Sequence, residues 1–354
     1  MAVSSDLKNI MTAYRALSFS DRAAFYSTVS NDICVTGEHL QSFLIETRIR
    51  RDQGCIYCGS AHVVKNGTRK DGTQRFLCRS CRRSFLPTSN SVTSRTRKRL
   101  SVWASYINCM LDKKTLRETA EECQISMTTA FLWRHKILDG LHEMAENIYL
   151  DGVVEADETF FNVSYKRNHR HFAMPRVPHK RGGSVHAKGL SFEKVCVPCA
   201  VSDAGLSYAR PAKLGKVSSE CISETFDGII SPHATLCTDN EKAYRTFARD
   251  NKNRLIQMDT DCRTRELSGE TYGIQRVNAC HSSMKGFLHR FRGVSTKYLE
   301  NYLVWNGLLA NSRRSREELF SLLLAQILTV PITIRNRDVS QRPPLPGMAA
   351  FNIA

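Results

Sequence analysis

The sequence predicts a multidomain α/β protein in which segments of different character follow one another along 354 residues. Four cysteines fall in two close pairs between residues 55 and 81, and apolar residues recur with helical spacing over residues 98–146. From residue 150 onward, runs typical of strands alternate with runs typical of helices. Because no apolar run reaches the roughly 18 residues that span a bilayer, and the first residues lack a secretory pattern, we expect a cytoplasmic protein.

Residues 1–48 are expected to form a helical N-terminal segment, since apolar positions in "LKNIMTAYRAL" and "DRAAFYSTV" repeat with helical spacing. The chain has 13 cysteines, an odd number, and most of them lie outside the paired cluster. Reduced thiols therefore fit the sequence better than a framework of disulfides.

The paired cysteines predict a zinc ribbon over residues 49–90. Cys55, Cys58, Cys78 and Cys81 form the pattern C-x2-C-x19-C-x2-C. Each C-x2-C turn brings two thiolates onto one ion, and two turns complete a closed tetrahedral site with structural Zn2+. Short strands are expected in "HVVKNGT" and "TQRFLC", beside turns at Gly67 and Gly72. The alternative is four buried or free cysteines.

Positive charge is concentrated around this segment. The formal net charge is +17, and residues 48–99 carry 14 Lys and Arg against Asp52 and Asp71. Such a block suits a polyanion such as DNA, although a solvated basic surface is the alternative interpretation. Arg82 and Arg83, directly after the second cysteine pair, are candidate DNA contacts.

Residues 98–146 are predicted to form a helix-turn-helix DNA-binding region. In "LRETAEECQISMTTAFLWRHKIL", Ala120 allows two helices to approach, Ile125 fills the turn and Ser126 caps the second helix. A recognition helix presents side chains near its start to the major groove. The predicted outward residues are Thr128, Thr129 and Arg134. A plain helical packing unit is the alternative.

Residues 150–315 are predicted to form a mixed α/β domain, followed by a C-terminal tail over residues 316–354. Residues 165–188 form an expected basic loop within the domain. Cys196 and Cys199 repeat the C-x2-C spacing, but they lie in a β-patterned run without a second pair, so we interpret them as core cysteines.

Two aspartates lie in predicted strands of this domain, Asp157 within "VVEADETFF" and Asp239 near the end of "ATLCTDN". Carboxylates on neighbouring strands can hold Mg2+, which prefers oxygen ligands, and such metals serve phosphoryl displacement. Aspartates also end strands in many α/β proteins that bind no metal.

Five segments together resemble the bacterial insertion-sequence transposases of the DDE superfamily. They are the zinc ribbon, the helix-turn-helix ending in "TTAFLWRHKIL", "VVEADETFF", "LCTDNEKAY" and "VNACHSSMKGFLHRFRGVSTKYLENYLVW". The resemblance is closest to the group with an N-terminal zinc ribbon and an Asp-Asp-Asn-Lys signature, and it covers residues 55–305. It implies an RNase H-like catalytic domain that acts in DNA recombination and transposition.

The resemblance also implies the catalytic residues. Asp157 and Asp239 match the first two acids, Asn278 the third position and Lys285 the following lysine. Asn278, His281 and Lys285 share one helical face because they are three and four residues apart. The broader superfamily has Glu where this chain has the uncharged Asn278, so His281 and Glu155 are the alternatives for a third ligand.

The predicted function is a DNA transposase that binds the terminal repeats of a mobile element and catalyses phosphodiester cleavage and strand transfer. It would use catalytic Mg2+ or Mn2+, with double-stranded DNA of the element ends and the target as partners and no membrane. Joining two ends implies a homo-oligomer, at least a dimer. The alternatives are a catalytically inactive DNA-binding regulator derived from a transposase, and a nuclease that cuts without joining.

Overall fold

The computed structural model describes residues 42, 44–45, 48–49, 54–142, 147–166, 193–259, 264–267 and 269–342. It divides into two compact units, one of Met1–Gly140 with Arg313–Arg335 and one of Leu141–Ser312 with Asn336–Ala354. The helical segment predicted for residues 1–48 and the loop predicted for 165–188 lie almost entirely outside the described residues. None of the helices in the described ranges is long and apolar enough to cross a membrane.

The first unit starts with a small antiparallel sheet of three strands. Its strands follow chain order and are β1 (Val63–Thr68), β2 (Gln74–Cys78) and β3 (Ser84–Phe85). The two longer strands confirm the prediction. Their buried core consists of Phe76, Phe85, Cys55 and Cys78. So small a core stabilises little by itself, and folds of this size usually need a metal or another crosslink.

The first unit also contains helices whose buried side chains pack together. They are α4 (Leu100–Leu111), α5 (Leu116–Glu122), α6 (Met127–Gly140) and α12 (Arg316–Thr329). Thr115 and Glu118 form a reciprocal capping box at the start of α5, which fixes where that helix begins. Trp103 of α4 stacks on Trp133 of α6 with ring centroids 3.7 Å apart, so the two helices share one aromatic core.

The C-terminal segment differs from the predicted tail. Ser315 caps α12 through a second capping box with Glu318, and Leu323, Ile327 and Leu328 are buried in the first unit. Helix α12 packs on α4 and α6. The apolar repeat of "ELFSLLLAQIL" therefore completes the helical core, which requires a chain that returns from the second unit.

The second unit contains a six-stranded sheet in the order β6-β5-β4-β8-β9, with β7 also paired to β5. The strands are β4 (Val153–Asn162), β5 (Lys194–Ser202), β6 (Ser207–Ala209), β7 (Lys213–Leu214), β8 (Thr235–Thr238) and β9 (Arg254–Gln257). Strand β4 is antiparallel to β5 and parallel to β8, which is parallel to β9. The predicted strands and the hairpin turn at Gly205 are confirmed. A hairpin of β10 (Thr264–Leu267) and β11 (Glu270–Gly273) was not predicted.

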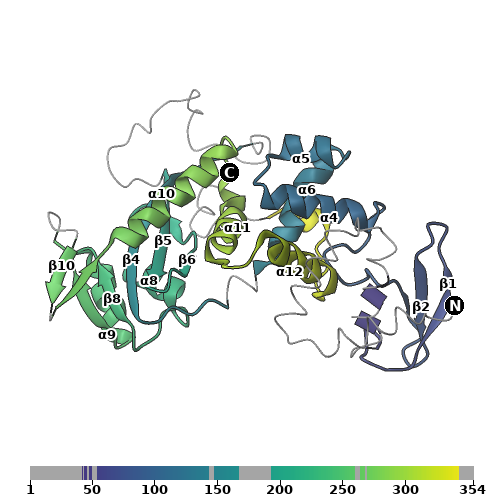
Figure 1. The fold of residues 1–354 in the computed structure, drawn as a ribbon, viewed down its shortest axis with the longest axis horizontal. Helices are drawn as coiled ribbons and strands as arrows, with labels where there is room; N and C mark the ends of the chain where they lie inside the picture. Colours follow the sequence, from purple (N-terminus) through teal and green to yellow (C-terminus); the bar gives the residue numbers. More distant parts are fainter. Residues whose placement is uncertain are drawn as a thin grey trace, which may run out of the picture. The chain divides into compact units, whose positions relative to one another are not determined.

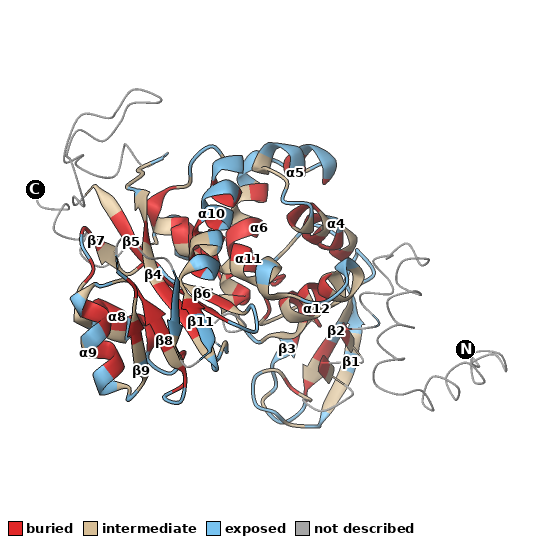
Figure 2. Cartoon of the chain, turned by 60° about the vertical axis from the view of Figure 1, so that its left-hand side comes forward, coloured by how far each residue is buried: buried red, intermediate tan, exposed pale blue. Residues whose placement is uncertain are grey.

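Helices cover both faces of this sheet (Figure 1). They are α8 (Ser219–Phe226), α9 (Lys242–Asp250), α10 (Gln275–Arg290) and α11 (Leu299–Asn311). The unit also contains a 3-10 turn η2 (Thr296–Tyr298) and a short helix α13 (Asn336–Ser340), joined by a hydrogen bond from the Tyr298 hydroxyl to the carbonyl of Val339. Alternate residues of β4 point to opposite faces, so Val154 and Ala156 join the core under α8 and α9. Helix α10 packs on β4 and β5, where Glu155 bonds to it. Figure 2 shows the central strands largely buried. Cys196 and Cys199 are fully buried in β5, which confirms them as core residues.

Candidate functional site

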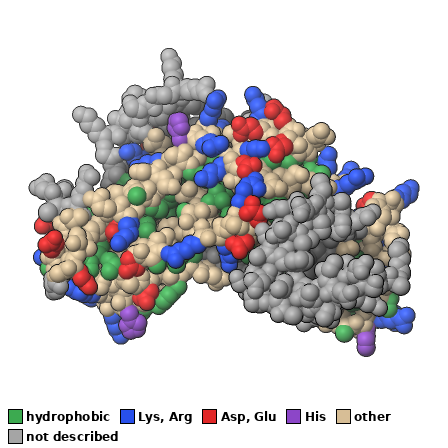
Figure 3. All heavy atoms as spheres, viewed as in Figure 1, with side chains coloured by type: hydrophobic (Ala, Val, Ile, Leu, Met, Phe, Trp, Pro, Cys, Tyr) green, Lys and Arg blue, Asp and Glu red, His purple; other side chains and the backbone are tan. Residues whose placement is uncertain are grey.

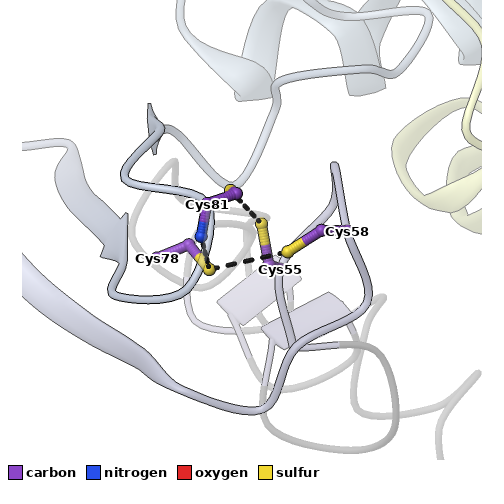
Figure 4. Close-up of side chains that lie close together, drawn as sticks. All are labelled: Cys55, Cys58, Cys78 and Cys81. Atoms are coloured by element: carbon purple, nitrogen blue, oxygen red, sulfur yellow. Dashed lines mark hydrogen bonds between the residues drawn. The ribbon is translucent and has the colours of Figure 1, made fainter.

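The four paired cysteines meet at one point in the first unit (Figure 4). Their sulfur atoms all lie within 4.8 Å of one another. The Sγ atoms of Cys55 and Cys81 are 3.6 Å apart, and those of Cys58 and Cys78 are 3.7 Å apart. A tetrahedral ion with zinc–sulfur bonds of about 2.3 Å requires edges of about 3.8 Å, whereas a disulfide requires about 2 Å. The sulfurs are therefore spaced as ligands of a single ion.

The backbone of both turns supports this arrangement. The N–H of Cys81 donates to Cys78 Sγ at 3.5 Å, and this bond is the largest cause that lowers the pKa of the Cys78 thiol to about 6. Gly54 precedes the first turn with φ +53°, and a Cβ there would lie 2.2 Å from the carbonyl oxygen of Ser60. That carbonyl accepts from the N–H of Cys55, so the close approach is part of the turn.

In the second unit, strand pairing brings Asp157 and Asp239 together. Strands β4 and β8 run parallel, and their pairing ends at Ala156 and Thr238. The next residue of each strand is an aspartate, and both aspartates lie on the face that carries α10. The Asp157 Oδ1 accepts from the N–H of Glu158 at 2.8 Å, and the Asp239 Oδ1 accepts from the N–H of Glu241 at 3.0 Å.

These two carboxylates repel each other. Burial raises the pKa of Asp157 to about 6, and the neighbouring charge of Asp239 adds to the increase. Two ionised carboxylates at one sheet edge are stable only with a compensating positive charge. Carboxylate oxygens are the ligands that Mg2+ and Mn2+ prefer, so the chemistry and placement of this pair fit a divalent cation.

Glu155 holds the start of α10 against β4. Its Oε2 accepts from the backbone N–H of Arg276 at 2.6 Å and of Val277 at 3.1 Å, and its Oε1 accepts from the Arg276 guanidinium at 3.1 Å. Helix α10 has no side-chain cap from its own N-cap residue, Ile274, so this strand carboxylate takes over that role. Both oxygens of Glu155 are thus engaged with α10, which favours a capping role over the predicted role as a substitute metal ligand.

His281 lies over Asp157 one turn further along α10. Its Nδ1 is 3.9 Å from Asp157 Oδ2, and its ring is almost fully buried. Burial lowers the pKa of His281 to about 4, and the charge of Lys285 lowers it further, so the imidazole is neutral at pH 7. The Nε2 atom is buried and has no hydrogen-bond partner among the described residues. His281 thus belongs to the wall of the site.

Asn278 and Lys285 lie on either side of His281 along the helix. The Lys285 side chain is exposed, and its charge lowers the pKa of both Asp157 and His281. The Asn278 amide donates from Nδ2 to the carbonyl of Ile274 at 2.8 Å, which leaves Oδ1 as an acceptor. In the part of the chain that the structure describes, Asn278 makes no hydrogen bond to either aspartate.

Glu158 is a further half-buried acid next to this site, on the other face of β4, that sequence analysis missed. Its Oε2 accepts from the hydroxyl of the fully buried Tyr244 at 3.2 Å. Burial raises the pKa of Glu158 to about 8, with further contributions from Asp157 and Asp239. The adjacent acids in "ADETFF" were the available signal. Strand alternation places Glu158 on the face of β4 opposite Asp157, where it contacts Tyr244 of α9.

The predicted recognition helix is corrected at one position. The Ser126 hydroxyl accepts from the N–H of Thr129 at 3.1 Å, which confirms it as the cap of α6, and Thr128 is exposed beside it. Arg134 is fully buried, and its guanidinium donates to Lys114 O at 2.9 Å and to Thr119 Oγ1 at 3.1 Å. It lies four residues after the buried Ala130, on the inward face, and cannot contact DNA.

The predicted ribbon contacts Arg82 and Arg83 are both exposed. On the face of the molecule shown in Figure 3, Lys and Arg side chains are interspersed with acidic ones.

Comparison with known proteins supports an insertion-sequence transposase of the DDE type, because the second unit matches a transposase domain and a relative comes from a transposable element. Residues 149–304 match the family model of the ISXO2-like transposase domain, which confirms the resemblance found in the sequence. The uncharacterized protein in transposable element ISH50 of Halobacterium salinarum is 26% identical over 280 residues, which are 76% of this chain and 89% of that protein. The alignment with the solved pre-cleavage Mos1 transpososome covers 87% of this chain and 98% of the Mos1 chain, at 10% sequence identity. Its TM-score of 0.20 is too low for any structural argument.

Substitution of Asp157 should stabilise the protein in the absence of divalent cations. The folded-state pKa of about 6 exceeds the ordinary value of 3.8, so folding favours the protonated form and stability falls as pH rises between these values. Asp157→Asn should raise the free energy of unfolding by about 1 to 3 kcal/mol at pH 7.5 and by much less at pH 4.

The measurement is denaturation at both pH values, without chelator so that the cysteine site is undisturbed. Asp250→Asn, at an exposed aspartate paired with Arg249, is the control and should have little effect. Added Mg2+ should stabilise the unsubstituted protein and the control but not Asp157→Asn. Equal destabilisation by Asp157→Asn at both pH values would contradict the repulsion.

The cysteine cluster predicts roughly one zinc per chain, because the binding free energy of such a site is also folding free energy. Gly54→Ala should abolish zinc binding, since its Cβ would collide with the Ser60 carbonyl. Gly59→Ala is the matched control: it has φ +70° but no atom within 4 Å of the added carbon, so it should cost about 1 kcal/mol and keep the metal. Elemental analysis of both variants tests the site, and metal-free unsubstituted protein would rule it out.

Proposed function

We propose that this chain is a DNA transposase that binds the terminal repeats of a mobile element and catalyses metal-dependent cleavage and strand transfer. The observation that carries the proposal is the pair of aspartates on neighbouring strands, Asp157 within β4 and Asp239 directly after β8, beneath the polar face of α10. The match of residues 149–304 to a transposase domain supports the same activity. The strand order β6-β5-β4-β8-β9, antiparallel on one side of β4 and parallel on the other, supports an RNase H-like fold.

Asp157 and Asp239 would hold the divalent cations, with the Asn278 Oδ1 as a neutral third oxygen. When bound, Mg2+ or Mn2+ supplies activation of a water or a DNA 3′-hydroxyl and stabilisation of the charge on the phosphate. Neutral His281 lies over Asp157 and would help to exclude water from its carboxylate. Exposed Lys285 would place its charge on a phosphate of the DNA.

The first unit would supply DNA binding. The cysteine cluster would hold structural Zn2+ and present Arg82 and Arg83 to phosphates, while Thr128 and Thr129 at the start of α6 would contact bases. We further propose that two copies act together, because two element ends must be joined.

The alternative function is a DNA-binding regulator that has lost its chemistry. Asn278 favours it, since an uncharged amide that already bonds to Ile274 is a weaker metal ligand than a glutamate. A catalytic assay separates the two functions, because both require the same DNA binding.

Strand transfer of labelled element ends in Mg2+ is the direct test. Asp157→Asn or Asp239→Asn should each lower the rate by roughly 100-fold or more while end binding persists, because each removes a charged ligand and little packing. Asp250→Asn should retain the activity. Full activity of Asp157→Asn or Asp239→Asn would show that the site is misplaced, and inactive unsubstituted protein that still binds ends would favour the regulator.

Asn278→Ala and Lys285→Ala should both lower strand-transfer activity, but they should respond differently to added metal. Raised Mn2+ should partly restore Asn278→Ala, because that variant loses metal occupancy. It should not restore Lys285→Ala, because no ion replaces the positive charge on the DNA phosphate.

A further inference from the structure

Tyr57 is an exposed aromatic side chain built into the first cysteine turn. It lies between Cys55 and Cys58, and its backbone N–H donates to Cys55 Sγ at 3.5 Å. Even so, 46% of the residue is exposed, which makes it one of the few large apolar side chains at the described surface. The turn that positions the sulfurs therefore also fixes the position of this ring.

The ring has a defined orientation. It packs edge-to-face on buried Phe85, with centroids 6.1 Å apart and an interplanar angle of 86°. The guanidinium carbon of Arg83 lies over it, 5.3 Å from its centroid. A ring held on two sides and open on the rest can accept a flat partner without a large loss of side-chain entropy.

Arg82 adds a second observation on the other cysteine turn. It follows Cys81 as Gly59 follows Cys58, and both residues have positive φ, +57° for Arg82 and +70° for Gly59. Glycine adopts this conformation without strain, whereas arginine does not. Strained residues of this kind concentrate at functional sites, and the Arg82 side chain is exposed.

The charge around this surface selects a polyanion. Residues 54–99 contain 11 Lys and Arg and a single acidic residue, Asp71. Base stacking on an aromatic ring needs an open base face, which a base inside a duplex does not offer because its neighbours already cover it. An unpaired base at a strand end does offer one, and arginines beside the ring can contact its phosphates.

We propose that Tyr57, Arg82 and Arg83 form a stacking surface that binds an unpaired nucleotide of DNA, with the base against the Tyr57 ring and the arginines on the flanking phosphates. This inference rests on the proposed function as a DNA-binding protein. It adds a preference for frayed or overhanging strands, which DNA cleaved one strand at a time presents beside the cut.

The test uses the full chain with zinc, a blunt duplex, and the same duplex with a short overhang that contains 2-aminopurine. Unsubstituted protein should bind the overhang duplex more tightly and quench the 2-aminopurine fluorescence. Tyr57→Ala should lose roughly 10-fold in affinity for the overhang duplex, and the quenching, with little change for the blunt duplex. Tyr57→Phe should behave as the unsubstituted protein, and Tyr57→Leu, which keeps apolar bulk, should behave as Tyr57→Ala.

Arg82→Gly separates binding from folding. It removes the strained conformation, so zinc content and thermal stability should hold or improve while both DNAs bind more weakly and with a shallower salt dependence. Unchanged binding by Arg82→Gly, or equal losses on both DNAs for Tyr57→Ala, would overturn the stacking surface and leave the proposed function standing. If the unsubstituted protein binds neither DNA, the proposed function itself fails.

Discussion

The carboxylate of Glu155 is the interaction on which the arrangement of the second unit depends. It comes from the middle of the sheet, yet it caps α10 through the N–H groups of Arg276 and Val277. Burial raises the pKa of Glu155, and these hydrogen bonds oppose that increase. A buried carboxylate at a helix N-terminus is favourable because it satisfies free donors and complements the helix dipole. The cap sets both where α10 begins and which face it turns toward β4.

The polar residues of α10 follow from that anchor. With the first turn fixed at Glu155, His281 comes to lie over Asp157, and Lys285 lies one turn beyond. Asp157, beside Asp239, is then half-buried under the helix, and this burial raises its pKa. A site of this kind trades stability of the empty protein for affinity toward a cation.

Local sequence patterns predicted the features that are determined by residues close together in the chain. The cysteine spacing predicted the cluster, and the placement of Asp157 and Asp239 on two predicted strands allowed their meeting once those strands paired side by side. What the sequence could not show depends on distant partners. Glu155 is polar like a ligand but bonds a helix 121 residues away. Arg134 has the charge of a DNA contact but bonds Thr119 inside the core, and residues 316–329 lie far along the chain from the helices that they cover.

Hydrogen exchange of α10 in variants of Glu155 tests this account most directly. Glu155→Ala should speed exchange at the Arg276 and Val277 amides by roughly 10-fold, as loss of a cap does, and should weaken Mn2+ binding at Asp157 and Asp239, which Glu155 would affect through the position of α10. Arg276→Ala, which removes only the guanidinium bond, should leave both nearly unchanged. Normal exchange and normal Mn2+ affinity in folded Glu155→Ala would contradict the claim that this carboxylate positions the site.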